Sequence, residues 1–217
     1  MLFRDRAHAG RLLADRLAFY AGDPSLLVLA LPRGGVPVAF EIASSLGAPL
    51  DVFNVRKLGL PDQPELALGA IAPGGVRVLN EDVIQTLAVP PEVLDEITAG
   101  QTAKLEQLEQ VYRGDRPPAD VRDRTVILVD DGLATGSTMR AAVEAIRLQA
   151  PRRIVVAVPV GSANTCAELT GTADEVMCAQ TPEPFCAVGL WYSDFTQTTD
   201  EEVRALLERA RENIVRA

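Results

Sequence analysis

The chain has 217 residues, a hydrophobic fraction of 47% and a charged fraction of 24%, which are ordinary values for a soluble globular protein. Its formal net charge of −9 at pH 7 argues against a nucleic-acid polymer or an anionic membrane as partner, but it leaves room for a small cationic pocket. One histidine and three cysteines, none of them in a C-x-x-C pair, leave little material for a zinc site or a Ser/His/Asp triad. No signal peptide and no membrane-length apolar run is evident, so we expect a cytoplasmic protein with reduced thiols.

Short apolar runs alternate with helical patterns in the first third of the chain. The run at 26–31 is apolar throughout, as in a strand that is buried on both faces, and Pro32 and a glycine pair end it. The expected elements are a helix at 5–20, this strand, a helix at 36–46 stopped by Gly47, a strand at 50–55, a loop at 56–61, and a hairpin of 67–72 with 76–79.

The second half begins with a different pattern. Apolar residues recur at helical spacing among Glu and Gln over 91–113, which predicts one long amphipathic helix. The elements expected after it are a strand at 125–129, a loop at 130–138, a helix at 139–149, a strand at 154–158, a helix at 163–169, a strand at 175–178, and a helix at 201–214 with Asp200 as its N-cap.

This alternation predicts βαβ crossovers and therefore one α/β domain over residues 1–217, with a mostly parallel twisted sheet flanked by helices. Ligands of such sheets bind at the carboxyl ends of the strands. The loops that follow the strands are therefore where chemistry is expected.

The loop after the strand at 125–129 carries the strongest signal. Four buried aliphatic residues deliver the adjacent acids Asp130 and Asp131 to a strand end, where their repulsion would cost stability in a plain turn. The segment Thr135–Thr138 then offers hydroxyls, a glycine and the free N–H groups of a starting helix, which suit a phosphate dianion. Acids for sugar hydroxyls followed by a phosphate cradle indicate a phosphorylated pentose. A strand-to-helix turn with solubilising acids and capping hydroxyls is the alternative.

This segment resembles the phosphoribosyl pyrophosphate (PRPP) motif of the type I phosphoribosyltransferases, a hydrophobic strand followed by D-D-x-x-x-T-G-x-T. The resemblance implies a Rossmann-like fold with a small hood over the site, to which this chain adds the helix at 91–113 as an insertion. It also implies that Asp130 and Asp131 contact the ribose 2- and 3-hydroxyls. The residues that would hold the 5-phosphate are Ala134, Thr135, Gly136, Ser137 and Thr138.

Two further loops fit this resemblance. Arg33, Gly34 and Gly35 follow the first strand and are similar to the pyrophosphate loop, where family members often hold a non-proline cis peptide, expected here at Pro32–Arg33 or Arg33–Gly34. Arg56 and Lys57 follow the second strand and resemble a basic pair near the pyrophosphate and the dimer contact. A helix-start turn with a surface arginine, and a solvated basic turn, are the respective alternatives.

The base-binding hood varies within the family, and 181–195 is the candidate segment. Phe185, Trp191 and Tyr192 are the residues expected to stack on a heteroaromatic ring, unless they are core anchors for the final helix. The covering loop of the family would fall at 61–65. Ala134 replaces the acid that members acting on 6-oxopurines usually carry, which argues against hypoxanthine or guanine as acceptor.

The reaction that the resemblance implies is displacement of pyrophosphate from C1 of PRPP by a small nitrogen acceptor, a nucleobase or related heterocycle, with Mg²⁺ as cofactor. Mg²⁺ would be carried by PRPP, with Asp130 and Asp131 as further candidate ligands. Asp130, Asp131, Arg33 and Lys57 are the candidate catalytic residues. A homodimer is expected, as is common in the family. A non-catalytic PRPP-binding regulator is the alternative function, and a different nucleotide or sugar phosphate is the third.

Overall fold

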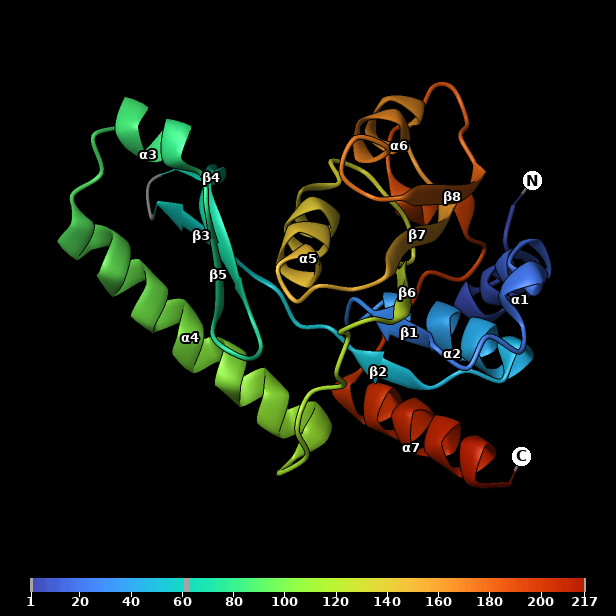
Figure 1. Cartoon of the computed structure of the whole chain (residues 1–217). Helices are drawn as coiled ribbons and strands as arrows, with labels where there is room; N and C mark the ends of the chain where they lie inside the picture. The colour runs from blue at the N-terminus through green and yellow to red at the C-terminus, as the bar shows by residue number, and fades with distance from the viewer. Residues whose placement is uncertain (1, 61–62, 217) are drawn as a thin grey trace.

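The computed structural model describes residues 2–60 and 63–216, and within these it contains two sheets (Figure 1). The larger sheet is parallel, with strand order β2-β1-β6-β7-β8, and the smaller is antiparallel, with order β3-β4-β5. The strands are β1 (Leu26–Ala30), β2 (Leu50–Val52), β3 (Arg56–Leu60), β4 (Gln63–Ala72), β5 (Val76–Leu79), β6 (Thr125–Val129), β7 (Arg153–Val160) and β8 (Glu175–Gln180). The predicted α/β class with a mostly parallel sheet is confirmed.

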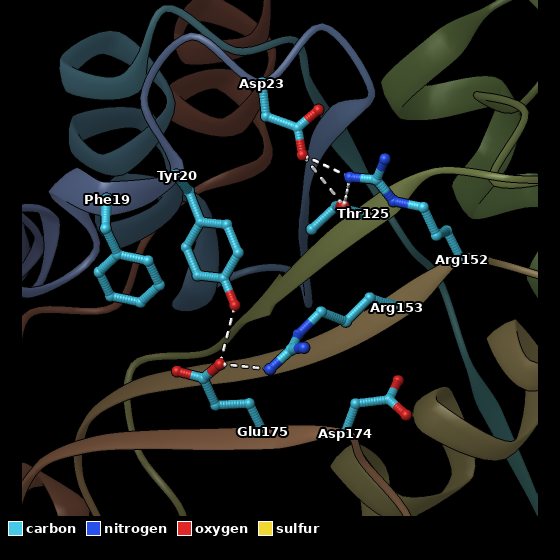
Figure 2. Close-up of a pocket in the computed structure, with 8 residues that line it drawn as sticks. All are labelled: Phe19, Tyr20, Asp23, Thr125, Arg152, Arg153, Asp174 and Glu175. Atoms are coloured by element: carbon cyan, nitrogen blue, oxygen red, sulfur yellow. Dashed lines mark hydrogen bonds and ion pairs between the residues drawn. The ribbon is translucent and has the colours of Figure 1, made fainter.

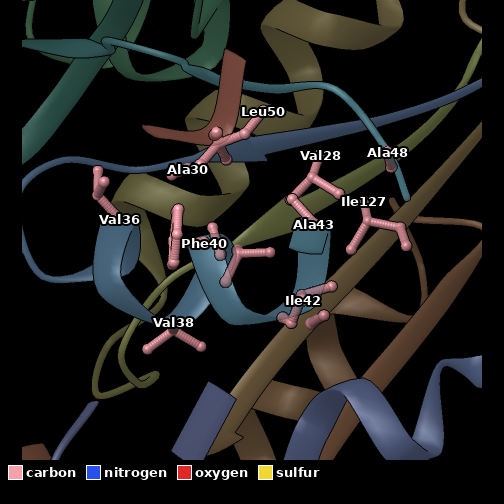
Figure 3. Close-up of a cluster of buried hydrophobic side chains, with 14 of the residues drawn as sticks. Val28, Ala30, Val36, Val38, Phe40, Ile42, Ala43, Ala48, Leu50 and Ile127 are labelled. Atoms are coloured by element: carbon pink, nitrogen blue, oxygen red, sulfur yellow. The ribbon is translucent and has the colours of Figure 1, made fainter. Parts of the chain in front are cut away.

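Helices cover both faces of the parallel sheet. The helices are α1 (Arg6–Arg16), α2 (Gly35–Leu46), α3 (Glu81–Thr86), α4 (Pro91–Arg113), α5 (Ser137–Arg147), α6 (Ala163–Leu169) and α7 (Asp200–Arg216), with 3₁₀ turns η1 (Ala18–Tyr20) and η2 (Val188–Trp191). One face packs against α1, α2 and α7, and Figure 3 shows part of this core around α2. The other face packs against α5 and α6. The apolar runs are therefore buried on both sides, as their sequence predicts.

Capping residues set several helix ends. Asp5 accepts a hydrogen bond from the backbone N–H of His8 and begins α1, and Gly47 ends α2 in the left-handed conformation with φ 64°. At the start of α7, the Thr199 hydroxyl accepts from the N–H of Glu202, and the Glu202 carboxylate accepts from the N–H of Thr199. This reciprocal pair is a capping box, so the cap is Thr199 and the predicted cap at Asp200 is wrong.

The smaller sheet has its own core, formed with α3 and α4. Leu58, Leu68 and Ile71 of the sheet pack against Leu94 and Leu105 of α4. Figure 1 shows α4 running along this sheet, on the side away from α5. The long helix predicted at 91–113 is present with those bounds.

Several expectations differ from the structure in this region. The segment expected as a loop at 56–61 contains strand β3, because its backbone pairs with β4, and the strand expected at 50–55 ends at Val52. The short helix α3 was not predicted, although Asn80 caps it by accepting from the N–H of Val83. The strand expected at 67–72 begins at Gln63, so residues 63–65 of the expected covering loop belong to β4, and Pro61 and Asp62 lie outside the described residues. Within the described ranges, every helix is too short or too polar to cross a membrane.

Candidate active site

The loops that follow β1, β6 and β7 meet at one edge of the parallel sheet. The N–H of Leu31 donates to the carbonyl of Val129 at 2.9 Å, and the N–H of Leu133 donates to that of Val160 at 2.9 Å. These bonds join three loops at the carboxyl ends of their strands: the glycine loop (32–35) after β1, the acid loop (130–133) after β6, and the loop before α6 after β7. This is the position where open α/β sheets bind ligands.

Asp130 and Asp131 stand side by side at this edge. Burial, and then the charge of Asp131, raise the pKa of Asp130 well above its usual range. Burial also raises the pKa of Asp131, and the neighbouring Arg6 opposes that rise. The Asp130 carboxylate accepts the backbone N–H of Asp131 at 2.8 Å. The ionised forms of the two acids are therefore disfavoured by burial and by each other's charge. Hydroxyl donors of a bound sugar would stabilise these carboxylates.

The segment from Ala134 to Thr138 forms a tight turn into α5. Gly136 has φ 68°, and a Cβ there would lie 2.5 Å from the Thr165 methyl group, so both the backbone angle and the space require glycine. The Thr165 hydroxyl donates to the Ala134 carbonyl at 2.8 Å, and Arg140 donates to the Thr135 carbonyl at 2.8 Å. Sequence reasoning missed both of these supports: Thr165 comes from α6, and Arg140 of α5 folds back onto the turn.

The amino end of α5 is open to an anion. No side chain within the described ranges caps this helix, and the Thr135 and Ser137 hydroxyls lie 3.3 Å apart beside it. Free N–H groups and the positive end of the helix dipole are the features that bind phosphate. The placement of Thr135, Ser137 and the α5 start therefore matches what a phosphate cradle needs.

The glycine loop after β1 presses against the acid pair. Its Pro32–Arg33 peptide is cis, at one of the two bonds where the family resemblance places such a bond. A Cβ on Gly34 would lie 2.0 Å from Asp131 Oδ2, and one on Gly35 would lie 2.6 Å from the Val129 carbonyl oxygen. Both glycines are therefore required by close approach of the backbone to the end of β6.

Arg33 is exposed beside this loop. Burial and the hydrogen bond to Asp200 raise the pKa of the Tyr112 hydroxyl. The positive charge of Arg33 partly opposes this rise. The charge of Arg33 is therefore felt where Tyr112 of α4 contacts Asp200 of α7.

Arg56 and Lys57 lie on opposite faces of β3, because neighbouring strand residues alternate. Arg56 donates to the Gln101 side chain of α4 at 3.1 Å, on the face away from α5. Lys57 faces a cavity of about 640 Å³ between the smaller sheet and α5, which Ser137 and Arg140 also line. The structure therefore brings Lys57 toward the segment 134–138, here called the phosphate-type loop, and does not bring Arg56 there.

The three aromatic residues expected in the hood belong to a small core with the N-terminal segment, including Phe3. Tyr192 is buried, its ring centroid lies 5.3 Å from that of Phe3, and its hydroxyl donates to the Asp131 carbonyl at 2.6 Å. The Trp191 carbonyl accepts the backbone N–H of Phe3 at 2.9 Å, and Phe185 packs against the same cluster. Tyr192 thus supports the acid loop from behind, and the packing partner of this segment is the N-terminal segment, not the final helix.

A second cavity, of about 480 Å³, lies at the other end of the parallel sheet. Figure 2 shows that Thr125, Arg153 and Glu175, the first residues of β6, β7 and β8, line it. Its charges pair with one another, as in Arg153 with Glu175 at 2.9 Å, and burial together with Glu175 raises the pKa of Tyr20 to about 12. This is an ion-pair network that ties the amino ends of the strands together, remote from the acid pair.

The donor set at the acid pair fits Mg²⁺ only in company with a ligand. The described residues contain no group of three or more His, Cys, Asp or Glu side chains placed to hold a metal ion. Mg²⁺ typically binds through one or two carboxylates together with substrate phosphates and water. Asp130 and Asp131 match that pattern, and a bound polyphosphate would have to supply further ligands.

Known proteins share this sequence and this fold. The sequence-family model of the phosphoribosyl transferase domain matches residues 62–185, which is more than half of the chain. A Mycobacterium tuberculosis protein named "Putative phosphoribosyl transferase" is 48% identical over 216 residues, which cover 100% of this chain and 48% of that protein. The chain therefore spans about half the length of this relative.

Two further proteins are similar to this chain. The "Bifunctional protein PyrR" of Clostridium acetobutylicum is 32% identical over 139 residues, covering 63% of this chain and 58% of that protein. The crystal structure of TT1426 from Thermus thermophilus superposes with a TM-score of 0.87 at 46% identity, covering 96% of this chain and 99% of that one. With the acid pair and the phosphate-type loop at the expected edge of the sheet, the chain belongs to the phosphoribosyltransferase family.

Proposed function

We propose that this chain transfers the 5-phosphoribosyl group of PRPP to a nitrogen acceptor, a nucleobase or related heterocycle, with Mg²⁺ and with release of pyrophosphate. The observation that carries the proposal is the convergence of the acid pair, the open amino end of α5 and the glycine loop at one sheet edge. Each of these features suits one part of PRPP: the ribose hydroxyls, the 5-phosphate and the pyrophosphate.

The reaction forms a bond between the acceptor nitrogen and C1 while the bond from C1 to pyrophosphate breaks. The pyrophosphate leaves with the electron pair, and the proton of the acceptor nitrogen passes to the departing pyrophosphate or to water. Asp130 and Asp131 would hold the ribose hydroxyls and balance the positive charge that develops on the ring. Arg33 and Lys57 would neutralise the departing pyrophosphate. Mg²⁺, when bound with PRPP, would supply further charge neutralisation at the pyrophosphate oxygens.

The test incubates the protein with PRPP, Mg²⁺ and a panel of purines, pyrimidines and small amines, and measures pyrophosphate release. Neutralising the acids with Asp130→Asn plus Asp131→Asn should lower turnover on the order of a hundredfold or more, because the ring loses its anchoring and its electrostatic partner. Chelating Mg²⁺ should stop turnover, and restoring it should recover the rate.

The matched control is Asp95→Asn plus Glu96→Gln, which neutralises a second adjacent acid pair on an exposed part of α4. This variant should turn over like the wild-type protein. PRPP binding by calorimetry without turnover on any acceptor would contradict the transferase and support the regulator. Absence of PRPP binding would contradict both.

A further inference from the structure

Arg6, the first residue of α1, reaches the acid pair from the far end of the sequence. Its Nε donates to Asp131 Oδ2 at 2.8 Å, and the two side chains are only 11% and 15% exposed. Another nitrogen of the guanidinium donates to the Thr196 carbonyl at 2.7 Å, and its carbon lies 4.0 Å from the centroid of the Phe195 ring. Arg6 is thus fixed on three sides, and Asp131 is one of them.

The glycine loop closes on the same ion pair. The Cβ position of Gly34 lies 2.0 Å from Asp131 Oδ2 and 3.2 Å from Arg6 Nε, so the backbone of this loop packs directly on the pair. The Tyr192 hydroxyl holds the backbone carbonyl of Asp131 from another side. The N-terminal helix, the glycine loop and the segment 192–196 therefore converge on one carboxylate.

We propose that Arg6 is a positioning residue for Asp131: it binds one carboxylate oxygen and so sets the direction in which the other oxygen meets a ribose hydroxyl. This inference rests on the proposed function. A partly buried guanidinium that is already stacked and hydrogen-bonded loses little freedom when it orients a partner, which suits it to this task. A surface ion pair would not, because both side chains would be mobile and solvated.

The inference predicts that losing Arg6 affects ligands with ribose hydroxyls and spares a ligand without them. Calorimetry in the presence of Mg²⁺ would compare PRPP, ribose 5-phosphate and inorganic pyrophosphate. For Arg6→Met, which keeps the stem without the charge, we expect binding of PRPP and of ribose 5-phosphate to weaken roughly ten- to hundredfold. Pyrophosphate binding should change by less than about twofold, within the range of a neutral surface change.

Two further variants make the result specific. Arg11→Met removes another arginine of α1, whose ion pair with Glu41 at 2.9 Å is more exposed than that of Arg6, at 49% and 23% of the two side chains. This variant should bind all three ligands like the wild type. Arg6→Lys keeps the charge and should recover part of the PRPP affinity, and it serves as the test if Arg6→Met does not fold.

Three outcomes would overturn the inference. Unchanged PRPP binding in Arg6→Met would remove the positioning role and leave the proposed function intact. Equal weakening for PRPP and pyrophosphate, in either Arg6 variant, would show that Arg6 only stabilises the fold. Failure of the wild-type protein to bind PRPP would remove the proposed function, and this inference with it.

Discussion

At the residue scale, the buried carboxylate of Asp130 costs stability in the folded chain, and the sign of that cost can be tested. Its folded-state pKa is raised by burial and by Asp131, so the folded chain keeps this proton at pH values where the unfolded chain has lost it. The contribution of Asp130 to the free energy of unfolding therefore falls as pH rises above the ordinary aspartate pKa of about 3.9. Asp130→Asn keeps a carbonyl oxygen to accept the N–H of Asp131 and removes the charge.

We expect Asp130→Asn to raise the free energy of unfolding at neutral pH by about 0.5–2 kcal/mol. The gain should shrink as pH falls through about 4 and vanish near about 3, where Asp130 is protonated in both the folded and the unfolded wild-type chain. Urea unfolding of the wild type and the variant across this pH range measures the gain. Asp95→Asn, at an exposed position, is the control and should show no such pH-dependent gain. A gain that is constant with pH would show that charge is not its cause.

At the element scale, what the sequence predicts depends on whether the signal is local. The strand over Thr125–Val129 and the long helix over 91–113 were predicted because each carries its own apolar pattern. Strand β3 was not, because Arg56 and Lys57 look like a loop and only the pairing with β4 makes them a strand. The candidate site divides in the same way. The acid pair and the phosphate-type loop are local motifs, whereas Arg6 lies 125 positions from Asp131 and carries no local signal.

Helix α4 is anchored at its carboxyl end by Arg113, which is 4% exposed. Arg113 donates to both oxygens of Asp51 at 3.0 and 3.1 Å, to Glu109, and to the Val52 carbonyl. Arg113→Met should lower the free energy of unfolding by about 3–5 kcal/mol, because Asp51 and Glu109 lose their buried partner. The measurement is equilibrium urea unfolding.

Arg204→Met provides the contrast, because the Arg204–Glu201 pair on α7 is 52% and 76% exposed. Its effect should stay below about 1 kcal/mol. Equal losses in the two variants would mean that the Arg113 cluster does not anchor α4. A large loss in Arg113→Met alone would show that charge holds the carboxyl end of the long helix to β2, in addition to the packing of its apolar face on the smaller sheet.

At the scale of the whole molecule, the chain is built around cores of unequal size. Every residue of β1 and β6 is buried, whereas the smaller sheet shares a limited core with α3 and α4. Hydrogen exchange should therefore be slowest in β1 and β6 and faster in β4 and β5, which open without global unfolding. The cavity that Lys57 shares with Ser137 and Arg140 lies between the smaller sheet and α5.

A ligand that binds Lys57 and the phosphate-type loop together would connect these two parts. Saturating PRPP with Mg²⁺ should therefore slow exchange in β4 and β5 by about tenfold or more, since opening of the smaller sheet would then require ligand release. Lys57→Met should keep most of the protection at β6 and α5 and lose it at β4 and β5. Mass spectrometry of peptides from each region measures the protection at β6 and α5 separately from that at β4 and β5. Protection of β4 and β5 that persists in Lys57→Met would show that the smaller sheet closes on the ligand without this lysine, and that Lys57 does not contact the pyrophosphate.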